Sequence, residues 1–203
     1  MIKDEPAQLP LLNQETVFSG RIWDVREDTF QFGDEQLTRD YIVHPGAVGV
    51  IALNDLGQML LVQQYRHSQR KLMWEPPAGL LDVANENPLD AAKRELQEET
   101  GYLASDWRVL FDFAPSAGSS SELIRCYLAT GLELHEEGRP EAEGEERHMK
   151  VQWVPVGEVM EAIHTGSISN SLLITGTFAL LAAMADPDSI VRDGDAPWVA
   201  RGI

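Results

Sequence analysis

Residues 79–102 read GLLDVANENPLDAAKRELQEETGY and contain a helix with both of its end signals. Asn87 is of a type that caps helix N-termini, and Pro88 suits the first helical position. Gly101 is of the type that ends a helix in the left-handed conformation. The sequence therefore predicts a helix over 88–100, and its register fixes which side chains share a face.

The last turn of this predicted helix is crowded with negative charge. Glu95 precedes Glu98 and Glu99 by three and four residues, so the carboxylates share a face at a cost of roughly 0.2–0.5 kcal/mol per pair. They also lie at the negative end of the helix dipole. A hard divalent ion such as magnesium would relieve this repulsion, because it takes carboxylate oxygens together with waters and substrate phosphates. A solvated acidic face is the alternative, since it explains most charge runs.

Arg94 and the glutamates extend this pattern into a longer motif. The segment resembles the Nudix box, in which a glycine, five residues, a glutamate and seven residues precede Arg-Glu-aliphatic-x-Glu-Glu-x-Gly-aliphatic. Here six residues separate Gly79 from Glu86, so Asn85 stands at the usual glutamate position, and Tyr102 replaces the final aliphatic residue. The seven-residue spacing from Glu86 to Arg94 is kept. We therefore expect a changed loop and helical carboxylates that stay in register.

The resemblance covers about residues 16–184 and narrows the family to ADP-ribose pyrophosphatases of the actinobacterial type. It is carried by HPGAVGV at 44–50, QQYRH at 63–67, WEPPAGLLDV at 74–83 and GRPEAEGEERHM at 138–149. It implies an α/β fold, a Nudix-type α/β/α sandwich with a mixed sheet. It also implies Mg²⁺-dependent hydrolysis of the ADP-ribose diphosphate to AMP and ribose 5-phosphate.

The same resemblance implies the ligands of two or three Mg²⁺ ions, with Mn²⁺ as the alternative metal. These are Glu95 and Glu99, helped by Glu98 and by the backbone carbonyl of Ala78. Arg94 either orients the carboxylates through bidentate hydrogen bonds or forms a plain ion pair.

The general base is expected outside the helix, in the acidic, Gly/Pro-broken segment 136–147, EEGRPEAEGEER. Glu145 matches the base of similar enzymes, and Glu146 is its close competitor. Solvated surface charge is the alternative for both residues.

Substrate contacts follow from the resemblance as well. Arg66 matches an arginine that grips the diphosphate, against the alternative of a surface arginine. Glu75 and Glu122 could bind the adenine side or the terminal ribose. In related dimers N-terminal residues exchanged between subunits grip the adenine, and the matching positions here are Ile22 and Arg39.

One departure bears on the substrate. The usual Ser-Pro-Gly turn of such enzymes is Ser116-Ala117-Gly118 here. We expect ADP-ribose as the substrate, with NADH, sugar nucleotides and diadenosine polyphosphates as alternative substrates. A noncatalytic nucleotide-binding sensor and a hydrolase of damaged nucleoside triphosphates are further alternatives.

Composition agrees with one catalytic domain. The chain has 203 residues, 43% of them hydrophobic, which allows a full core. Residues 1–10 lack the apolar stretch of a signal peptide, so we expect a cytoplasmic protein without a membrane span. The net charge of −17 argues against nucleic acid and anionic membranes as partners and favours a small nucleoside diphosphate substrate. The single cysteine, Cys126, is expected in the core.

Three regions are predicted along the chain. Residues 1–44 form an N-terminal antiparallel β region that a homodimer could exchange, with strands at 18–32 and 36–43. Residues 45–185 form the hydrolase domain, and residues 186–203 an irregular tail pinned by Trp198. The hydrolase domain has predicted strands and helices, listed in chain order: strands 47–53, 58–65, 107–113, 123–129 and 149–156, and helices 88–100, 157–164 and 170–184.

Overall fold

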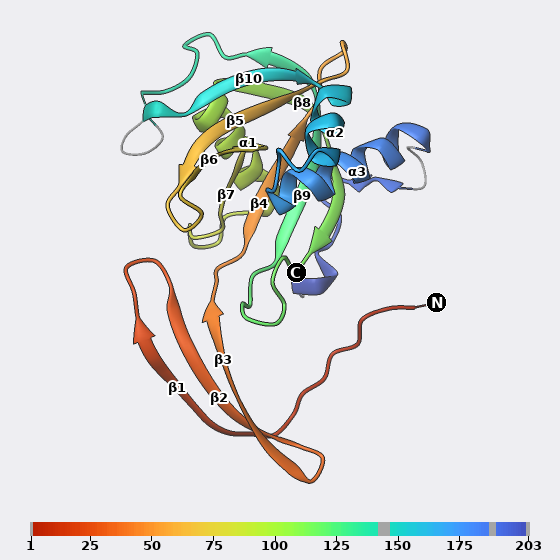
Figure 1. Cartoon of the computed structure of the whole chain (residues 1–203). Coiled ribbons are helices and arrows are strands. Elements are labelled where there is room, and N and C mark those ends of the chain that lie inside the picture. The colour runs from red at the N-terminus through yellow and green to blue at the C-terminus, as the bar shows by residue number, and fades with distance from the viewer. Residues whose placement is uncertain (1, 142–146, 187–189, 202–203) are drawn as a thin grey trace. The chain divides into compact units, whose positions relative to one another are not determined.

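The computed structural model describes residues 2–141, 147–186 and 190–201, and the chain divides into two compact units (Figure 1). The first unit contains Met1–Pro45 together with Ser116–Glu122, and the second contains Gly46–Pro115 and Leu123–Ile203. The sequence predicted a change of region at residue 44. It did not predict that residues 116–122 belong with the N-terminal strands.

The first unit is an antiparallel sheet in the order β1 (Leu11–Ser19), β2 (Asp24–Phe32) and β3 (Glu35–Val43). The turn between β2 and β3 contains Gly33, whose φ of 59° favours glycine. The N-terminal antiparallel region is thus confirmed, but one predicted strand over 18–32 is two strands, and β1 begins well before it. All of β1 is exposed, and its polar centre, NQET, lacks the alternation of apolar and polar residues that would have predicted a strand there.

The second unit contains a mixed five-stranded sheet, in which β4 and β9 run parallel and the other neighbours antiparallel. In spatial order its strands are β11 (Arg192–Asp193), β8 (Tyr102–Phe113), β9 (Ile124–Leu134), β4 (Ala47–Ala52) and β7 (Ala78–Leu80). A three-stranded sheet has the order β10 (Lys150–Pro155), β5 (Gln58–Arg66) and β6 (Lys71–Glu75).

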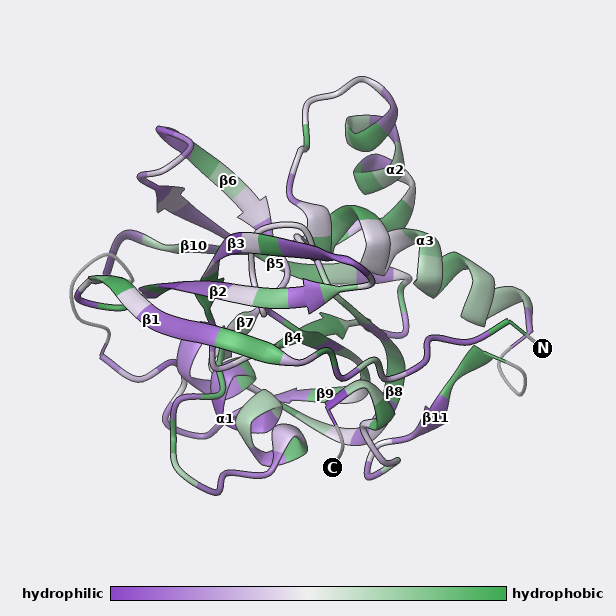
Figure 2. Ribbon diagram, turned by 90° about the horizontal axis from the view of Figure 1, so that it is seen from below, coloured by the Kyte–Doolittle hydropathy of each residue, from purple (hydrophilic) through white to green (hydrophobic). Residues whose placement is uncertain are grey.

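Helices cover both faces of the five-stranded sheet. Val48 and Val50 of β4 belong to the apolar cluster that contains Leu96 of α1 (Pro88–Thr100). Ile51 belongs to the other cluster, with α2 (Val156–His164) and α3 (Ser171–Ala185). This alternation follows from the two-residue period of a strand. It gives the predicted helix–sheet–helix sandwich, in which α3 is mostly hydrophobic and α1 mixes polar and apolar residues (Figure 2).

The C-terminal segment is more ordered than predicted. Arg192 of β11 pairs with Val109 of β8, and Trp198 is only 1% exposed. Arg125 donates hydrogen bonds to the carbonyls of Ala196 (2.6 Å) and Pro197 (3.1 Å) and lies 4.9 Å from the Trp198 ring centre. Within the described residues no helix is long and apolar enough to cross a membrane.

Candidate active site

Helix α1 has the end structure that its sequence predicts. The Asn87 side chain accepts a hydrogen bond from the Leu89 N–H at 2.9 Å. Gly101 has a left-handed φ of 77°, and its N–H donates to the Gln97 carbonyl at 2.8 Å. The helix therefore ends immediately after Glu98 and Glu99, which fixes both carboxylates in its last turn.

The Arg94 guanidinium joins three carboxylates. Its Nε and Nη2 each donate to one oxygen of Glu86 at 2.9 Å, which makes a bidentate pair. Its Nη1 donates to Glu95 at 2.7 Å and to Glu98 at 3.0 Å. The hydrogen bonds with Arg94 lower the pKa of Glu86, and those with Glu86 are the main cause that raises the pKa of Arg94. The ion pair is present, but the predicted bidentate hydrogen bonds are made to Glu86, while Glu95 and Glu98 each accept a single bond from Nη1.

The extra residue before α1 is accommodated at Asn85. This residue has a φ of 64°, a conformation that asparagine adopts more readily than most residues. Glu86 then keeps its place opposite Arg94. Helix α1 therefore has the register that the spacing from Glu86 to Arg94 predicts.

Strand β7 lies directly against the acidic side of α1. The Ala78 N–H donates to Oε2 of Glu99 at 3.0 Å, and Glu99 is only 4% exposed. A methyl group at Gly79 would overlap the Glu95 carboxylate, so the absence of a side chain there leaves room for that group. Carboxylate oxygens are the ligand type that a hard divalent cation prefers. Among the described residues, however, no three acidic, histidine or cysteine side chains converge on one point that could hold a metal ion. Glu99 is more buried than the helical pattern predicted.

Arg66 and Glu75 form a second charged pair, at the ends of neighbouring strands β5 and β6. Arg66 Nε donates to both Glu75 oxygens, at 2.9 and 3.1 Å, and Nη2 donates to Oε2 at 2.6 Å. Glu75 is 3% exposed, whereas 45% of the Arg66 side chain is exposed. The buried carboxylate thus holds an arginine whose side chain is nearly half exposed.

Comparison with known proteins decides the family. The model of the NUDIX domain matches residues 43–172. The chain belongs to the Nudix family. It is 42% identical to the ADP-ribose pyrophosphatase of Mycobacterium tuberculosis over 194 residues, which cover 94% of this chain and 91% of that protein.

Two further likenesses support this assignment. The chain is 35% identical to the ADP-ribose pyrophosphatase of Bacillus subtilis over 127 residues, 62% of this chain and 68% of that one. A crystal structure of an ADP compounds hydrolase covers 91% of this chain and 98% of its own at a TM-score of 0.76. At 20% identity this match shows the fold, which is the predicted Nudix sandwich. This protein is a Nudix hydrolase, and Nudix hydrolases generally use a divalent metal ion.

Three residues predicted for substrate binding in this Nudix hydrolase belong to the first unit. Glu122 lies 3.3 Å from His44, between carboxylate Oε1 and ring Nε2, and burial raises the pKa of Glu122. Trp23 stacks on the His44 ring with 4.4 Å between centres. Ile22 is 70% exposed, and Arg39 lies on β3 with an exposed side chain.

The turn that lacks the usual proline also belongs to the first unit. The Ser119 and Ser120 N–H groups both donate to the Ser116 carbonyl at 3.0 Å. The Ser116 and Ser119 hydroxyls lie 2.8 Å apart. A hydrogen-bonded turn therefore forms around Ala117 without proline.

The predicted base lies outside the described residues, as Glu145 and its competitor Glu146 are in 142–146. Next to this stretch the structure shows a contact that the sequence analysis missed. Arg139 Nη1 donates to the Met149 carbonyl at 3.2 Å, and Nε lies 3.4 Å from the Glu98 carbonyl. The available signal was a helix without a basic residue in its last turn and an arginine in GRPEAEGEER.

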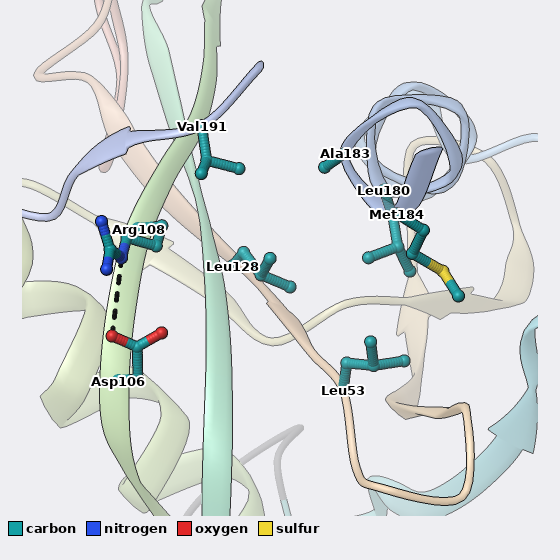
Figure 3. Close-up of a pocket in the computed structure, with 8 residues that line it drawn as sticks. All are labelled: Leu53, Asp106, Arg108, Leu128, Leu180, Ala183, Met184 and Val191. Atoms are coloured by element: carbon teal, nitrogen blue, oxygen red, sulfur yellow. Dashed lines mark ion pairs between the residues drawn. The ribbon is translucent and has the colours of Figure 1, made fainter. Parts of the chain in front are cut away.

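A cavity of about 400 Å³ lies on the other face of the Nudix sheet (Figure 3). Its apolar wall comes largely from the cluster that contains α3, including Leu180 and Ala183. Its charged residues are Asp106 and Arg108, whose side chains approach to 3.5 Å. Because α1 packs on the opposite face, this cavity is separate from the acidic turn.

Proposed function

We propose that this Nudix hydrolase cleaves the diphosphate of ADP-ribose and releases AMP and ribose 5-phosphate. The observation that carries the proposal is the 42% identity to an ADP-ribose pyrophosphatase over 94% of the chain. That likeness extends beyond residues 43–172, the part that the general family model matches. It therefore includes sequence outside the shared hydrolase domain, where specificity can differ between family members.

We propose that Glu95, Glu98, Glu99 and the Ala78 carbonyl hold two or three Mg²⁺ ions, with Mn²⁺ as a substitute. When bound, such ions neutralise the diphosphate and lower the pKa of a water beside it. Support comes from Arg94, which bonds Glu95 and Glu98 and so holds them on one side of the helix. The Ala78 N–H similarly orients Glu99.

Glu145 is the proposed general base, and Glu146 is its alternative. The water oxygen attacks one phosphorus atom, and the bond from that phosphorus to the bridging oxygen breaks. The water proton passes to the glutamate, and the bridging oxygen leaves with the other phosphate. Either direction of attack gives AMP and ribose 5-phosphate.

Arg66 is the proposed diphosphate contact, because its side chain is partly exposed while the buried Glu75 orients it. Glu75 was predicted to bind the adenine side or the terminal ribose, but it is buried and bonded to Arg66, so its proposed role is to hold Arg66. Glu122 is the proposed contact for the adenine side or the terminal ribose. Ile22 and Arg39 are proposed to reach the adenine of a partner subunit.

We propose that the first unit joins a second copy of the chain in a homodimer. All nine residues of β1 are exposed, among them Leu11 at 52% and Phe18 at 61%. Exposed apolar residues on an edge strand favour association. Light scattering tests this, with Phe18→Asp expected to give a monomer. Leu56→Asp is the control, because Leu56 is 82% exposed on a turn of the second unit.

Other diphosphates are the second candidate substrates, because Ala117 replaces the proline of similar enzymes. Purified protein should be incubated with excess Mg²⁺ and either ADP-ribose, NADH, a sugar nucleotide or a diadenosine polyphosphate, and the products separated by chromatography. AMP and ribose 5-phosphate should form fastest from ADP-ribose, and a chelator or Glu145→Gln should abolish them. Faster cleavage of another compound would replace ADP-ribose as the substrate, while binding without cleavage would indicate a sensor.

A further inference from the structure

Arg139 lies at the end of α1, where carbonyl groups lack helical partners. The last turn of α1 contains Glu98 and Glu99 but no basic residue. Arg139 supplies the missing cation from another segment, since its Nε lies 3.4 Å from the Glu98 carbonyl. That separation is long for a hydrogen bond, but a guanidinium there also complements the negative end of the helix dipole.

The main chain is held close to the same helix end. The His135 N–H donates to the Gly101 carbonyl at 2.8 Å. A Cβ atom at Gly101 would lie 2.5 Å from the backbone nitrogen of Arg139. Gly101 therefore serves two purposes: it adopts the left-handed conformation and lets the chain at Arg139 approach α1.

The Arg139 side chain also reaches the chain that leads into β10. Its Nη1 donates to the Met149 carbonyl at 3.2 Å, and its Nη2 lies 3.9 Å from the Met149 sulfur. Met149 is 7% exposed, so this contact is on a buried residue. One planar guanidinium thus connects α1 with the start of the β10 segment.

We propose that Arg139 is a positioning residue for the acidic turn of α1. Through the Glu98 and Met149 carbonyls it fixes the turn that carries Glu98 and Glu99 to the residues that precede β10. This role rests on the proposed function of that turn as the magnesium site. A lysine would keep the charge but lacks the planar fork that contacts both carbonyls.

The test compares wild type with Arg139→Gln, Arg139→Lys and Arg147→Gln by hydrogen–deuterium exchange at increasing Mg²⁺. Arg147 is a matched control, because it is an exposed arginine two positions before Met149. Exchange is followed in the last turn of α1 and at residues 148–152. The probe is magnesium alone, so this readout needs no substrate. kcat and KM for ADP-ribose are measured in parallel.

In Arg139→Gln, half-maximal protection of the α1 turn should require about 10- to 100-fold more Mg²⁺, and kcat should fall by a similar factor with little change in KM. Arg139→Lys should lie between wild type and Arg139→Gln, and Arg147→Gln should match wild type. Equal magnesium dependence in Arg139→Gln and Arg147→Gln would overturn the proposal. A shift in protection without ADP-ribose hydrolysis by wild type would support the role of Arg139 and refute the proposed substrate instead.

Discussion

Gly79 lies so close to Glu95 that a methyl group at residue 79 would occupy the space of the Glu95 carboxylate. The glycine stands in β7, and the glutamate stands on α1, next to the Arg94 fork. The absence of a side chain at residue 79 thus leaves the space that the Glu95 carboxylate occupies. A glycine that begins the motif and a glutamate that follows 16 positions later form one structural feature.

Gly79→Ala should reduce hydrolysis by about 10- to 100-fold and raise the Mg²⁺ concentration needed for activity. The Glu95 carboxylate is the far end of a flexible side chain, so the methyl group should displace it with little effect on Tm. Steady-state kinetics and thermal unfolding measure both effects. Gly157→Ala is the control, because nothing lies within 4 Å of its added Cβ. A normal rate in Gly79→Ala would show that the position of Glu95 is unimportant.

The Glu86–Arg94 pair should make stability depend on pH. The pKa of Glu86 is lowered from 4.5, chiefly by its hydrogen bond with Arg94. Because the pKa of Glu86 is lower in the folded state, the contribution of this pair to the free energy of unfolding is complete above pH 4.5. It is lost as the pH falls through the folded-state pKa of Glu86. The Tm difference between wild type and Glu86→Gln should therefore shrink as the pH is lowered below 4.5. Exposed Glu161→Gln serves as the control, and a difference that grows on acidification would contradict the ion pair.

Trp198 should contribute strongly to stability through the C-terminal segment. It is 1% exposed and lies near Arg125 and Arg201, with guanidinium-to-ring distances of 4.9 and 5.5 Å. Trp198→Ala should lower the free energy of unfolding by about 3–5 kcal/mol. The neighbouring Val199→Ala is a matched control, because Val199 is 84% exposed. Denaturant unfolding that gives equal values for both variants would show that this segment does not stabilise the fold.

Cys126 should be chemically inert in the folded protein. It is fully buried in the α3-side core, and burial raises the pKa of its thiol. Mass spectrometry after alkylation should find no modification under native conditions and one modified thiol in denaturant, with hydrolysis unaffected. Native modification accompanied by lost activity would assign this cysteine a role that its burial argues against.

Local signals were strong enough to predict α1. Asn87 and Gly101 set its ends, and their roles depend only on residues a few positions away. Five strands of the second unit (β4, β5, β8, β9 and β10) and both later helices were also found from short-range patterns, whereas the short strands β6, β7 and β11 were not predicted. The sandwich itself came from the resemblance, because the parallel pairing of β4 with β9 joins segments far apart in the sequence.

Long-range contacts are what the sequence reasoning missed. The pairing of β11 with β8 and the contact of Arg139 with α1 depend on how distant segments meet. The negative charge in the last turn of α1 indicated that a cation lies nearby, and we expected that cation to be magnesium. The structure shows that Arg94 and Arg139 already supply positive charge there, one from the helix and one from a remote loop.

The most direct test of the central claim is the rate of AMP formation from ADP-ribose at saturating Mg²⁺ in wild type and Glu99→Gln. Glu99 is buried and accepts a hydrogen bond from the Ala78 N–H. Glutamine has nearly the same size as glutamate but no charge. We predict magnesium-dependent release of AMP and ribose 5-phosphate by wild type and a loss of about 100-fold or more in the variant. Equal rates in the two proteins, or no AMP from wild type, would contradict an ADP-ribose hydrolase that works through the acidic turn of α1.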